Sequence, residues 1–312
     1  MAGRSSVQGV SATLTAVSGN HQWLDGGSMF GNAPRSVWSK WLPPDAAGRI
    51  RLACRAMLIE TGGRRILCET GIGAFFEPKL AERFGVEPRE HVLLESLAAL
   101  GLSDSDIDAV VLSHLHFDHA GGLLPTWSEI SAGRDRLLFP RAHFVVGREA
   151  FARASTPHPR DRASFIPGLV EKLTASGRLV VVDHPAESPV GAIVPAGAAE
   201  RVLGPGFEFM ITNGHTPGQL HTIFHGPNST VIFAGDLIPG MPWVHVPITM
   251  GYDRFPERLI DEKEHLYTQA IPNHWLIFFT HDLETAAAKV RRDPAGRVVG
   301  VDPVVDPCRM MI

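Results

Sequence analysis

The sequence predicts a single α/β domain that spans residues 1–312. Apolar segments rich in β-branched residues, typical of buried strands, alternate with segments of helical spacing in both halves of the chain. No low-complexity tract or linker separates the two halves. Several predicted strands end in a histidine or an aspartate, at the position where α/β proteins commonly build their sites. We expect the two ends, about residues 1–20 and 293–312, to be partly mobile.

The composition is that of an ordinary globular protein, 44% hydrophobic and 20% charged. A net charge of −4 gives no general electrostatic footprint for nucleic acid, and no run of 18 apolar residues could cross a membrane. The N-terminus lacks the apolar segment of a signal peptide. We therefore expect a cytoplasmic protein that acts on a small molecule, contacts neither nucleic acid nor membrane, and is a monomer or a homodimer.

The chain begins with polar and apolar residues in alternation over 7–17, which predicts a strand. Residues 23–41 combine Gly, Asn and Pro with large apolar side chains. We expect this segment to lack regular structure and either to pack over the core or to wall a pocket.

Two more strands are predicted over 50–60 and 64–69, joined by a turn at Gly62-Gly63. Helical spacing over 91–100 predicts a helix that ends near Gly101. Cys54, Cys68 and Cys308 are odd in number and widely spaced, so neither a disulfide framework nor a thiolate zinc site is indicated.

The central strand is predicted over the β-branched segment 107–112, and the most informative motif follows it. His114, His116, Asp118 and His119 form the pattern His-x-His-x-Asp-His. Imidazole and carboxylate suit Zn²⁺, with Mn²⁺, Fe²⁺ or Co²⁺ as alternatives. One tetrahedral ion cannot easily take four ligands from so short a loop, so the pattern indicates two ions side by side. The glycines that follow allow the chain to turn closely past the ligands.

Downstream of the motif, residues 141–146 predict a strand, 147–154 a short helix and 179–182 a short strand. Residues 155–168 form a long connection rich in Pro, Arg and His. Residues 185–206 are broken by Pro and Gly and predict little.

Three further strands are each expected to deliver one metal-capable residue at their ends. These strands and residues are 207–212 with His215, 230–234 with Asp236, and 276–280 with His281. The same local arrangement therefore occurs four times. The chain then predicts a helix over 283–292 and a tail.

These residues resemble the metallo-β-lactamase superfamily. The matching motifs are Ser-His-Leu-His-Phe-Asp-His-Ala-Gly-Gly at 113–122, Gly-His-Thr-Pro-Gly at 214–218, Ala-Gly-Asp at 234–236 and Thr-His-Asp at 280–282. The resemblance extends over about residues 50–283 and is nearest to the acyl-homoserine-lactone lactonases and the methyl-parathion-hydrolase-like members. It implies an αββα sandwich, in which two mixed sheets pack face to face between helices and the metals lie at one edge.

The resemblance also implies the ligands of two divalent ions. His114, His116 and His215 would hold the first ion, Asp118, His119 and His281 the second, and Asp236 would bridge them. Two ions about 3.5–4 Å apart can share a hydroxide that attacks an ester, a lactone or a phosphoester. Besides Asp236, Asp118 is a catalytic candidate as proton shuttle to the leaving group, if its second oxygen is free. Three residues are expected to hydrogen-bond ligands from behind: Glu69, Ser113 and Thr280.

One position departs from the lactonases. They carry a Tyr three residues after the bridging Asp, where this chain has Pro239. Tyr252, one of only two tyrosines, could enter the pocket from another loop, or it could be structural. We therefore predict a hydrolase of small lactones or carboxylic esters and keep a phosphotriester or phosphodiester hydrolase as the alternative.

Apolar residues near the motifs could wall a pocket suited to an acyl chain or an aryl leaving group, or they could belong to the core. The candidates are Met29, Phe30, Phe75, Phe76, Phe117, Ile238, Met241 and Trp243, together with His245. A nuclease of the same superfamily is disfavoured because no run of Lys and Arg is present, and a mononuclear iron oxygenase because His119 and His281 are both present.

Overall fold

The computed structural model describes residues 9–184 and 189–312. Its first sheet has seven strands in the order β16–β1–β4–β5–β6–β7–β8. These span Arg309–Met311, Ala12–Val17, Ala56–Thr61, Arg64–Cys68, Ala109–Leu112, His143–Gly147 and Leu179–Val182. Strands β5 to β8 run parallel to one another, and the remaining pairs are antiparallel. The sheet is therefore mixed.

The second sheet also has seven strands, in the order β15–β14–β13–β12–β11–β10–β9. These span Val298–Val305, Thr285–Arg292, Leu276–Phe278, Thr230–Phe233, Gln219–His225, Phe207–Thr212 and Ile193–Pro195. Only β12 and β13 pair in parallel. A separate two-stranded sheet joins β2 (Gln22–Asp25) to β3 (Arg49–Leu52).

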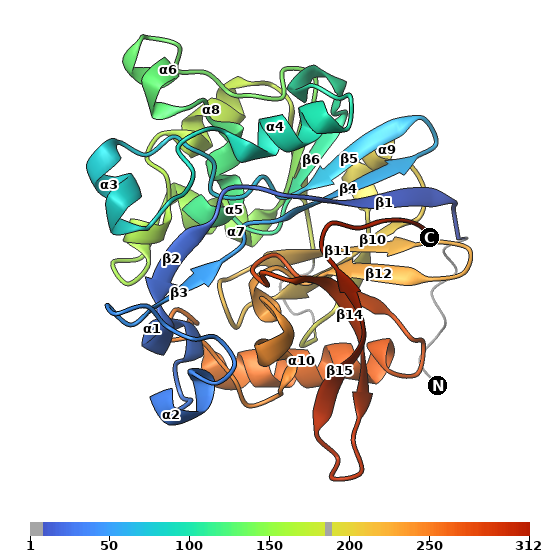
Figure 1. Ribbon diagram of the computed structural model, residues 1–312. Coiled ribbons are helices and arrows are strands. Elements are labelled where there is room, and N and C mark those ends of the chain that lie inside the picture. The colour runs from blue at the N-terminus through green and yellow to red at the C-terminus, as the bar shows by residue number, and fades with distance from the viewer. Residues whose placement is uncertain (1–8, 185–188) are drawn as a thin grey trace.

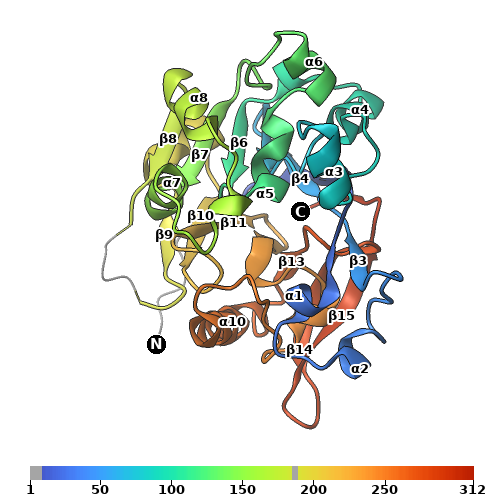
Figure 2. The same ribbon diagram turned by 90° about the vertical axis from the view of Figure 1, so that its left-hand side faces the viewer.

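Helices cover both outer faces of the paired sheets, as Figures 1 and 2 show. Beside the first sheet lie α3 (Pro78–Arg83), α4 (Val92–Ala99), α5 (Phe117–Ala120), α6 (Trp127–Ser131), α7 (Arg148–Ser155) and α8 (Leu169–Ala175). On the other side α10 (Pro256–Ala270) lies against the second sheet, near α1 (Gly26–Phe30) and α2 (Arg35–Trp38). A short helix, α9 (Glu200–Leu203), precedes β10.

Three buried apolar clusters fill these layers. The middle cluster holds residues from the facing sides of both sheets, such as Ile59 and Phe233, and the two outer clusters lie between each sheet and its helices. The predicted αββα sandwich is thus confirmed. Among the described residues, no helix is both long enough and apolar enough to cross a bilayer.

Most predicted elements are present with ends shifted by a few residues, but residues 283–292 are not a helix. Strand β14 occupies 285–292, and Ala286, Ala287 and Ala288 are fully buried in it. Alanine favours a helix, but this segment pairs on both sides, with β13 and β15, and that tertiary pairing outweighs the propensity.

The C-terminal residues, where the sequence suggests a partly mobile tail, form strands in both sheets. After β15 the chain crosses to the first sheet, where β16 pairs with β1. Ile312 and Ala12 exchange backbone hydrogen bonds of 3.0 and 3.3 Å. The predicted N-terminal strand is β1, although residues 7 and 8 of the predicted range lie outside the described residues.

Two N-terminal predictions also need correction. Residues 23–41 contain regular structure, because the Asp25 carboxylate accepts a hydrogen bond from the backbone N–H of Ser28 and so caps α1. Residues 50–60 form two strands, β3 and β4, because the chain leaves one sheet for another at Ala53–Arg55. Helix α10 and strand β11 (Gln219–His225) were not among the predicted elements.

Candidate metal centre

Seven metal-capable side chains come together at one edge of the two sheets. Each lies just beyond a short buried strand, β6, β10, β12 or β13, or in α5, which follows β6. They are His114, His116, Asp118, His119, His215, Asp236 and His281. The loop after α5 approaches the chain closely, since a Cβ at Gly122 would lie 2.1 Å from the carbonyl oxygen of Thr70. This position therefore requires glycine.

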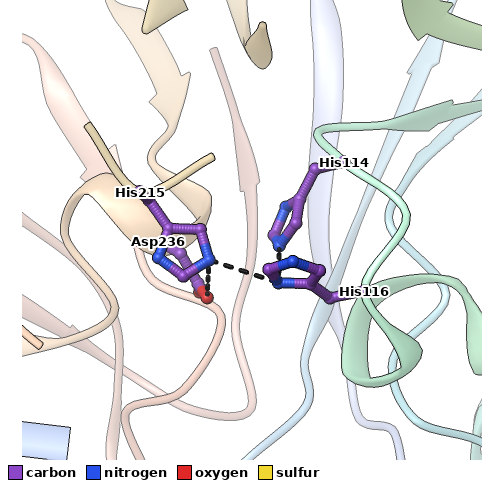
Figure 3. Close-up of side chains that lie close together, drawn as sticks. All are labelled: His114, His116, His215 and Asp236. Atoms are coloured by element: carbon purple, nitrogen blue, oxygen red, sulfur yellow. Dashed lines mark hydrogen bonds and ion pairs between the residues drawn. The ribbon is translucent and has the colours of Figure 1, made fainter. Parts of the chain in front are cut away.

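The side chains form two adjoining groups. In the first, His116 Nδ1 lies 2.9 Å from His114 Nε2 and 3.3 Å from His215 Nε2 (Figure 3). Asp236 Oδ2 completes this group at 3.2 Å from His215 Nε2. The nitrogens face one another across distances that a single cation can span.

The second group contains Asp118, His119 and His281. The other oxygen of Asp236, Oδ1, lies 3.3 Å from His119 Nε2 and 3.2 Å from His281 Nε2. The Asp118 oxygens lie 3.7 and 3.6 Å from the same two nitrogens. The Asp236 carboxylate therefore directs one oxygen to each group.

The donors fit divalent metal ions. His119 Nε2 and Asp236 Oδ1 are buried and lack a hydrogen-bond partner, an arrangement that is costly without a cation. Five imidazoles and two carboxylates form a borderline donor set that suits zinc and its neighbours in the periodic table.

The charges of the site favour cations in the second group. Burial lowers the pKa of His119, but Asp236, Asp118 and Glu69 outweigh burial and raise this pKa well above its usual value. Burial also lowers the pKa of His281, but the neighbouring Asp236 outweighs burial and raises this pKa to about 10. Burial and neighbouring histidines hold the pKa of His114 well below its usual value. Its neutral imidazole is the form that binds metals.

The first group is held from behind by Ser113 and by a loop that α10 fixes. Ser113 Oγ lies 2.9 Å from His114 Nδ1, and Asp253 Oδ1 lies 2.9 Å from His215 Nδ1. On α10, the buried Glu262 carboxylate accepts the backbone N–H groups of Asn213 and Gly214 at 2.7 and 2.9 Å. The histidine ligands of this group therefore have fixed orientations.

Lys263 holds the neighbouring loop. Its buried ammonium group donates to the carbonyl oxygens of His245, Val246 and Ile248 at 3.1, 3.4 and 2.9 Å. This loop leads directly to Asp253, so α10 supports both sides of His215.

The second group is held by N-terminal segments. Gln22 Nε2 on β2 donates to Asp118 Oδ2 at 2.7 Å, and the carbonyl oxygen of Ala53 lies 2.7 Å from His281 Nδ1. Glu69 Oε2 lies 3.4 Å from His119 Nδ1, and Glu69 Oε1 accepts the backbone N–H of Ser113 at 2.7 Å. The second oxygen of Asp118 is thus not free, contrary to the expectation above.

Of the three residues expected behind the ligands, Glu69 contacts His119 and Ser113 contacts His114, whereas Thr280 contacts the backbone. Thr280 Oγ1 donates to the carbonyl oxygen of Arg55 at 3.1 Å, and no bond from it to a ligand side chain is present among the described residues. The backbone N–H of Arg55 in turn donates to the carbonyl oxygen of Thr280 at 2.9 Å, so Thr280 joins the chain after β13 to the chain before β4.

A cavity of about 310 Å³ opens onto both groups. Its wall includes His116, Asp118, His215, Asp236 and His281. The remaining wall is formed by Leu24, Met29, Phe84, Phe117, Arg160, Asp161, Ala163, Ser164, Met250, Gly251 and Tyr252. Tyr252, which the sequence left between a pocket role and a structural one, lies in this wall.

Of the nine predicted pocket residues, only Met29 and Phe117 line this cavity. Phe30 is stacked between Trp38 and Trp243, at centroid distances of 5.6 and 4.6 Å, inside a core cluster that also contains Ile238. Phe75 and Phe76 pack in the other outer core. Met241 and His245 line a separate cavity beside β15. Proximity to a motif in the sequence was therefore a poor guide to which side chains line the cavity.

Sequence reasoning missed Gln22, Asp253 and the two charged residues of α10. A signal for the last pair was present. Positions 259, 262, 263, 266, 267 and 270 form one helical stripe that is buried throughout, and Glu262 and Lys263 are charges within it. A charge in an apolar stripe indicates a buried partner. Nothing near Gln22 or Asp253 in the sequence indicates their distant partners.

Comparisons with known proteins agree with this geometry. Residues 49–281 match the model of the Metallo-beta-lactamase superfamily. Probable metallo-hydrolases of Mycobacterium bovis and Mycobacterium tuberculosis are each 28% identical over 195 residues, which is 60% of this chain and 57% of theirs. A ribonuclease of Thermus thermophilus is 28% identical over 187 residues, 58% of this chain and 34% of its own length. The chain thus matches little more than half of the mycobacterial relatives and about a third of the ribonuclease.

Solved structures share the whole fold at low sequence identity. A probable metal-dependent hydrolase from Staphylococcus aureus superposes with a TM-score of 0.78 at 24% identity, covering 96% of this chain and 99% of that one. A dizinc quorum-quenching lactonase in complex with a product gives 0.67 at 20% identity, covering 93% and 94%. The family match spans most of the chain and includes all seven residues of the cluster, so this protein belongs to the metallo-beta-lactamase superfamily.

Proposed function

We propose that the protein is a metal-dependent hydrolase that holds two divalent ions, with zinc as the first choice, and cleaves a small lactone or carboxylic ester. The observation that carries this proposal is the Asp236 carboxylate, whose two oxygens face two different groups of ligands. The adjoining cavity is large enough for a small substrate. Structural likeness to a dizinc lactonase supports the choice of bond.

The ligand set of each ion follows from the two groups. His114, His116 and His215 would hold one ion, Asp118, His119 and His281 the other, and Asp236 would contact both. When bound, such ions make water nucleophilic near neutral pH and stabilise negative charge on the attacked oxygen. No Ser or Cys nucleophile is then needed.

Asp118 and Tyr252 are the groups of this chain placed to assist. Asp118 lies in the cavity wall, and the oxygen that accepts the Gln22 amide keeps a second lone pair that can take up a proton. We therefore assign Asp118 the transfer of a proton to the leaving-group oxygen. Tyr252 is 40% exposed and lines the same cavity, so its hydroxyl can donate to a substrate carbonyl. Tyr252 would thus replace the tyrosine that the lactonases carry at the position of Pro239.

The test is steady-state kinetics of protein loaded with a known amount of zinc or manganese. Metal content is measured by elemental analysis, and kcat/KM is compared for an acyl-homoserine lactone, a 4-nitrophenyl carboxylic ester and an aryl phosphotriester. We expect about two ions per chain and the highest kcat/KM on the lactone or the ester. The highest value on the phosphotriester would establish the alternative bond class instead. No metal-dependent turnover of any of the three would refute the proposal.

A further inference from the structure

Arg160 places an unneutralised positive charge in the wall of the metal-site cavity. It is the only Lys or Arg among the described residues that line this cavity. Its Nη2 donates to the carbonyl oxygens of Gly251 and Asp253 at 2.9 and 3.5 Å. Carbonyl oxygens orient a guanidinium group but do not neutralise it, and no carboxylate in the described part of the chain forms an ion pair with Arg160.

The acidic residue that follows Arg160 in the chain is paired with another arginine. Asp161 also lines the cavity, but its Oδ2 accepts both Nε and Nη2 of Arg153, at 2.9 and 2.7 Å. Arg254 lies close by, since its Nη1 is 3.4 Å from His158 Nδ1, the atom that also accepts the backbone N–H of Arg160 at 3.1 Å. Its Nε is buried and lacks a hydrogen-bond partner. Two further guanidinium groups, those of Arg153 and Arg254, therefore lie near Arg160 and Asp161.

The lining of the cavity also contains apolar side chains. Leu24 and Met29 come from β2 and α1, and the rings of Phe84 and Phe117 pack with centroids 4.6 Å apart. The cavity lining thus combines apolar side chains, one cationic side chain and the metal-capable residues. A substrate that fills it should carry an apolar group and an anionic group in addition to the bond that reacts.

We infer that Arg160 forms an anion-recognition subsite, supported by Arg254, and that the substrates are small esters or lactones bearing a second group with a permanent negative charge. A carboxylate, a phosphate or a sulfate has the required chemistry, and Arg recognises all of them through paired N–H donors. The substrate class rests on the proposed hydrolase function, whereas the binding of an anion at Arg160 does not.

The experiment uses two isosteric esters and the metal-loaded protein. The mono-4-nitrophenyl ester of glutaric acid carries a carboxylate where 4-nitrophenyl pentanoate carries a methyl group. We expect the wild type to prefer the glutarate ester by about 10- to 100-fold in kcat/KM. Arg160→Gln should remove most of this preference and leave turnover of the pentanoate within about threefold, while Arg160→Lys should restore part of it. The preference should also fall with added salt.

Arg162→Gln is the matched control, because Arg162 is exposed two residues away and does not line the cavity. It should behave as the wild type. Equal turnover of the two esters by the wild type, or an equal loss on both in Arg160→Gln, would refute the subsite while leaving the hydrolase function intact.

A binding measurement separates failure of the subsite from failure of the reaction. Calorimetry compares the monoanilide of glutaric acid with pentananilide, its neutral isostere, in which the reactive ester is replaced by an amide. We expect the anionic anilide to bind at least about tenfold more tightly to the wild type and to lose this advantage in Arg160→Gln. This result with no ester turnover would refute the hydrolase function and support the subsite. Equal affinities would refute the subsite even if both esters are cleaved.

Discussion

The two ligand groups of the metal centre are supported by different parts of the chain. His215 in the first group is held by Asp253 and, through its own loop, by Glu262 of α10. The second group is held by Gln22, by the carbonyl of Ala53 and by Glu69. The support of His215 is C-terminal, whereas that of the second group comes from N-terminal strands and their connections, and His114 is held by the adjacent Ser113.

This difference has a chemical side. The first group contains three imidazoles with one carboxylate, and an anionic aspartate orients His215. The second group contains two imidazoles with Asp118, and a neutral amide fixes that carboxylate. Because outer hydrogen bonds commonly change metal affinity by about 10- to 100-fold, each support should act mainly on its own ion. Substitutions can therefore test whether the two groups load independently.

The largest effect is expected for Asp236→Ala, which removes the residue shared by both groups. We predict loss of the second ion and a decrease in kcat/KM of at least about a thousandfold. Elemental analysis and steady-state kinetics measure the two quantities. Asp261→Ala, at an exposed position on α10, is the control for a general effect of losing a carboxylate. Two ions per chain in Asp236→Ala would disprove the bridging assignment.

Asp253→Asn should act on the first group alone. The amide can no longer accept the N–H of His215 as an anion does, so His215 loses part of its orientation and basicity. We predict a decrease in affinity for one ion of about 10- to 100-fold, with the other ion retained. Competition with a chromophoric chelator provides both dissociation constants. A parallel decrease in both would mean that the groups are not separable.

Gln22→Leu should act on the second group, with a smaller effect. It removes a buried hydrogen bond of 2.7 Å to Asp118 and keeps a similar side-chain volume. We predict a decrease of about tenfold in affinity for one ion, because Asp118 loses the donor that orients its carboxylate. Competition with a chromophoric chelator measures the dissociation constants of both ions. An unchanged affinity for both ions would limit Gln22 to a packing role.

The smallest effect at any one pH concerns Lys263, which supports the loop of the first group. Burial lowers the pKa of Lys263 from 10.5 to about 7. Between these two pH values Lys263 is protonated in the unfolded chain but not in the folded one. The free energy of unfolding therefore increases as pH rises from about 7 toward 10.5, and Lys263 destabilises the fold most below pH 7. The free energy of unfolding of the wild type relative to Lys263→Met should therefore increase with pH, by at most about 1.4 kcal/mol per pH unit.

Urea denaturation between pH 7 and 9.5 measures this slope. Lys79→Met, at an exposed position on α3, should show none. A flat difference for Lys263→Met would mean that its three carbonyl acceptors keep the ammonium charged throughout this range.

The residues that cluster in the site could be predicted from the sequence because each belongs to a short segment with its own signal. His215, Asp236 and His281 follow compact apolar strands in order, and family resemblance assigned them to ions. Their supports could not be predicted, since Gln22 and Asp118 are 96 residues apart and His215 and Asp253 are 38 apart. Strand β14 was mistaken for a helix for a similar reason, because pairing with two distant strands decides its conformation. Phe30 shows the same limit, since only its aromatic neighbours place it in the core.

Helix α10 has a consequence for how this enzyme class can diversify. Because Glu262 and Lys263 are adjacent, one turn of helix holds both the His215 loop and the loop that continues to Met250, Gly251 and Tyr252. Sequence change on that wall is therefore coupled to the metal centre and should be filtered by selection. Phe84 follows α3, an element that supplies no ligand. New specificities should arise there more readily, through substitutions that leave the metal ligands in place.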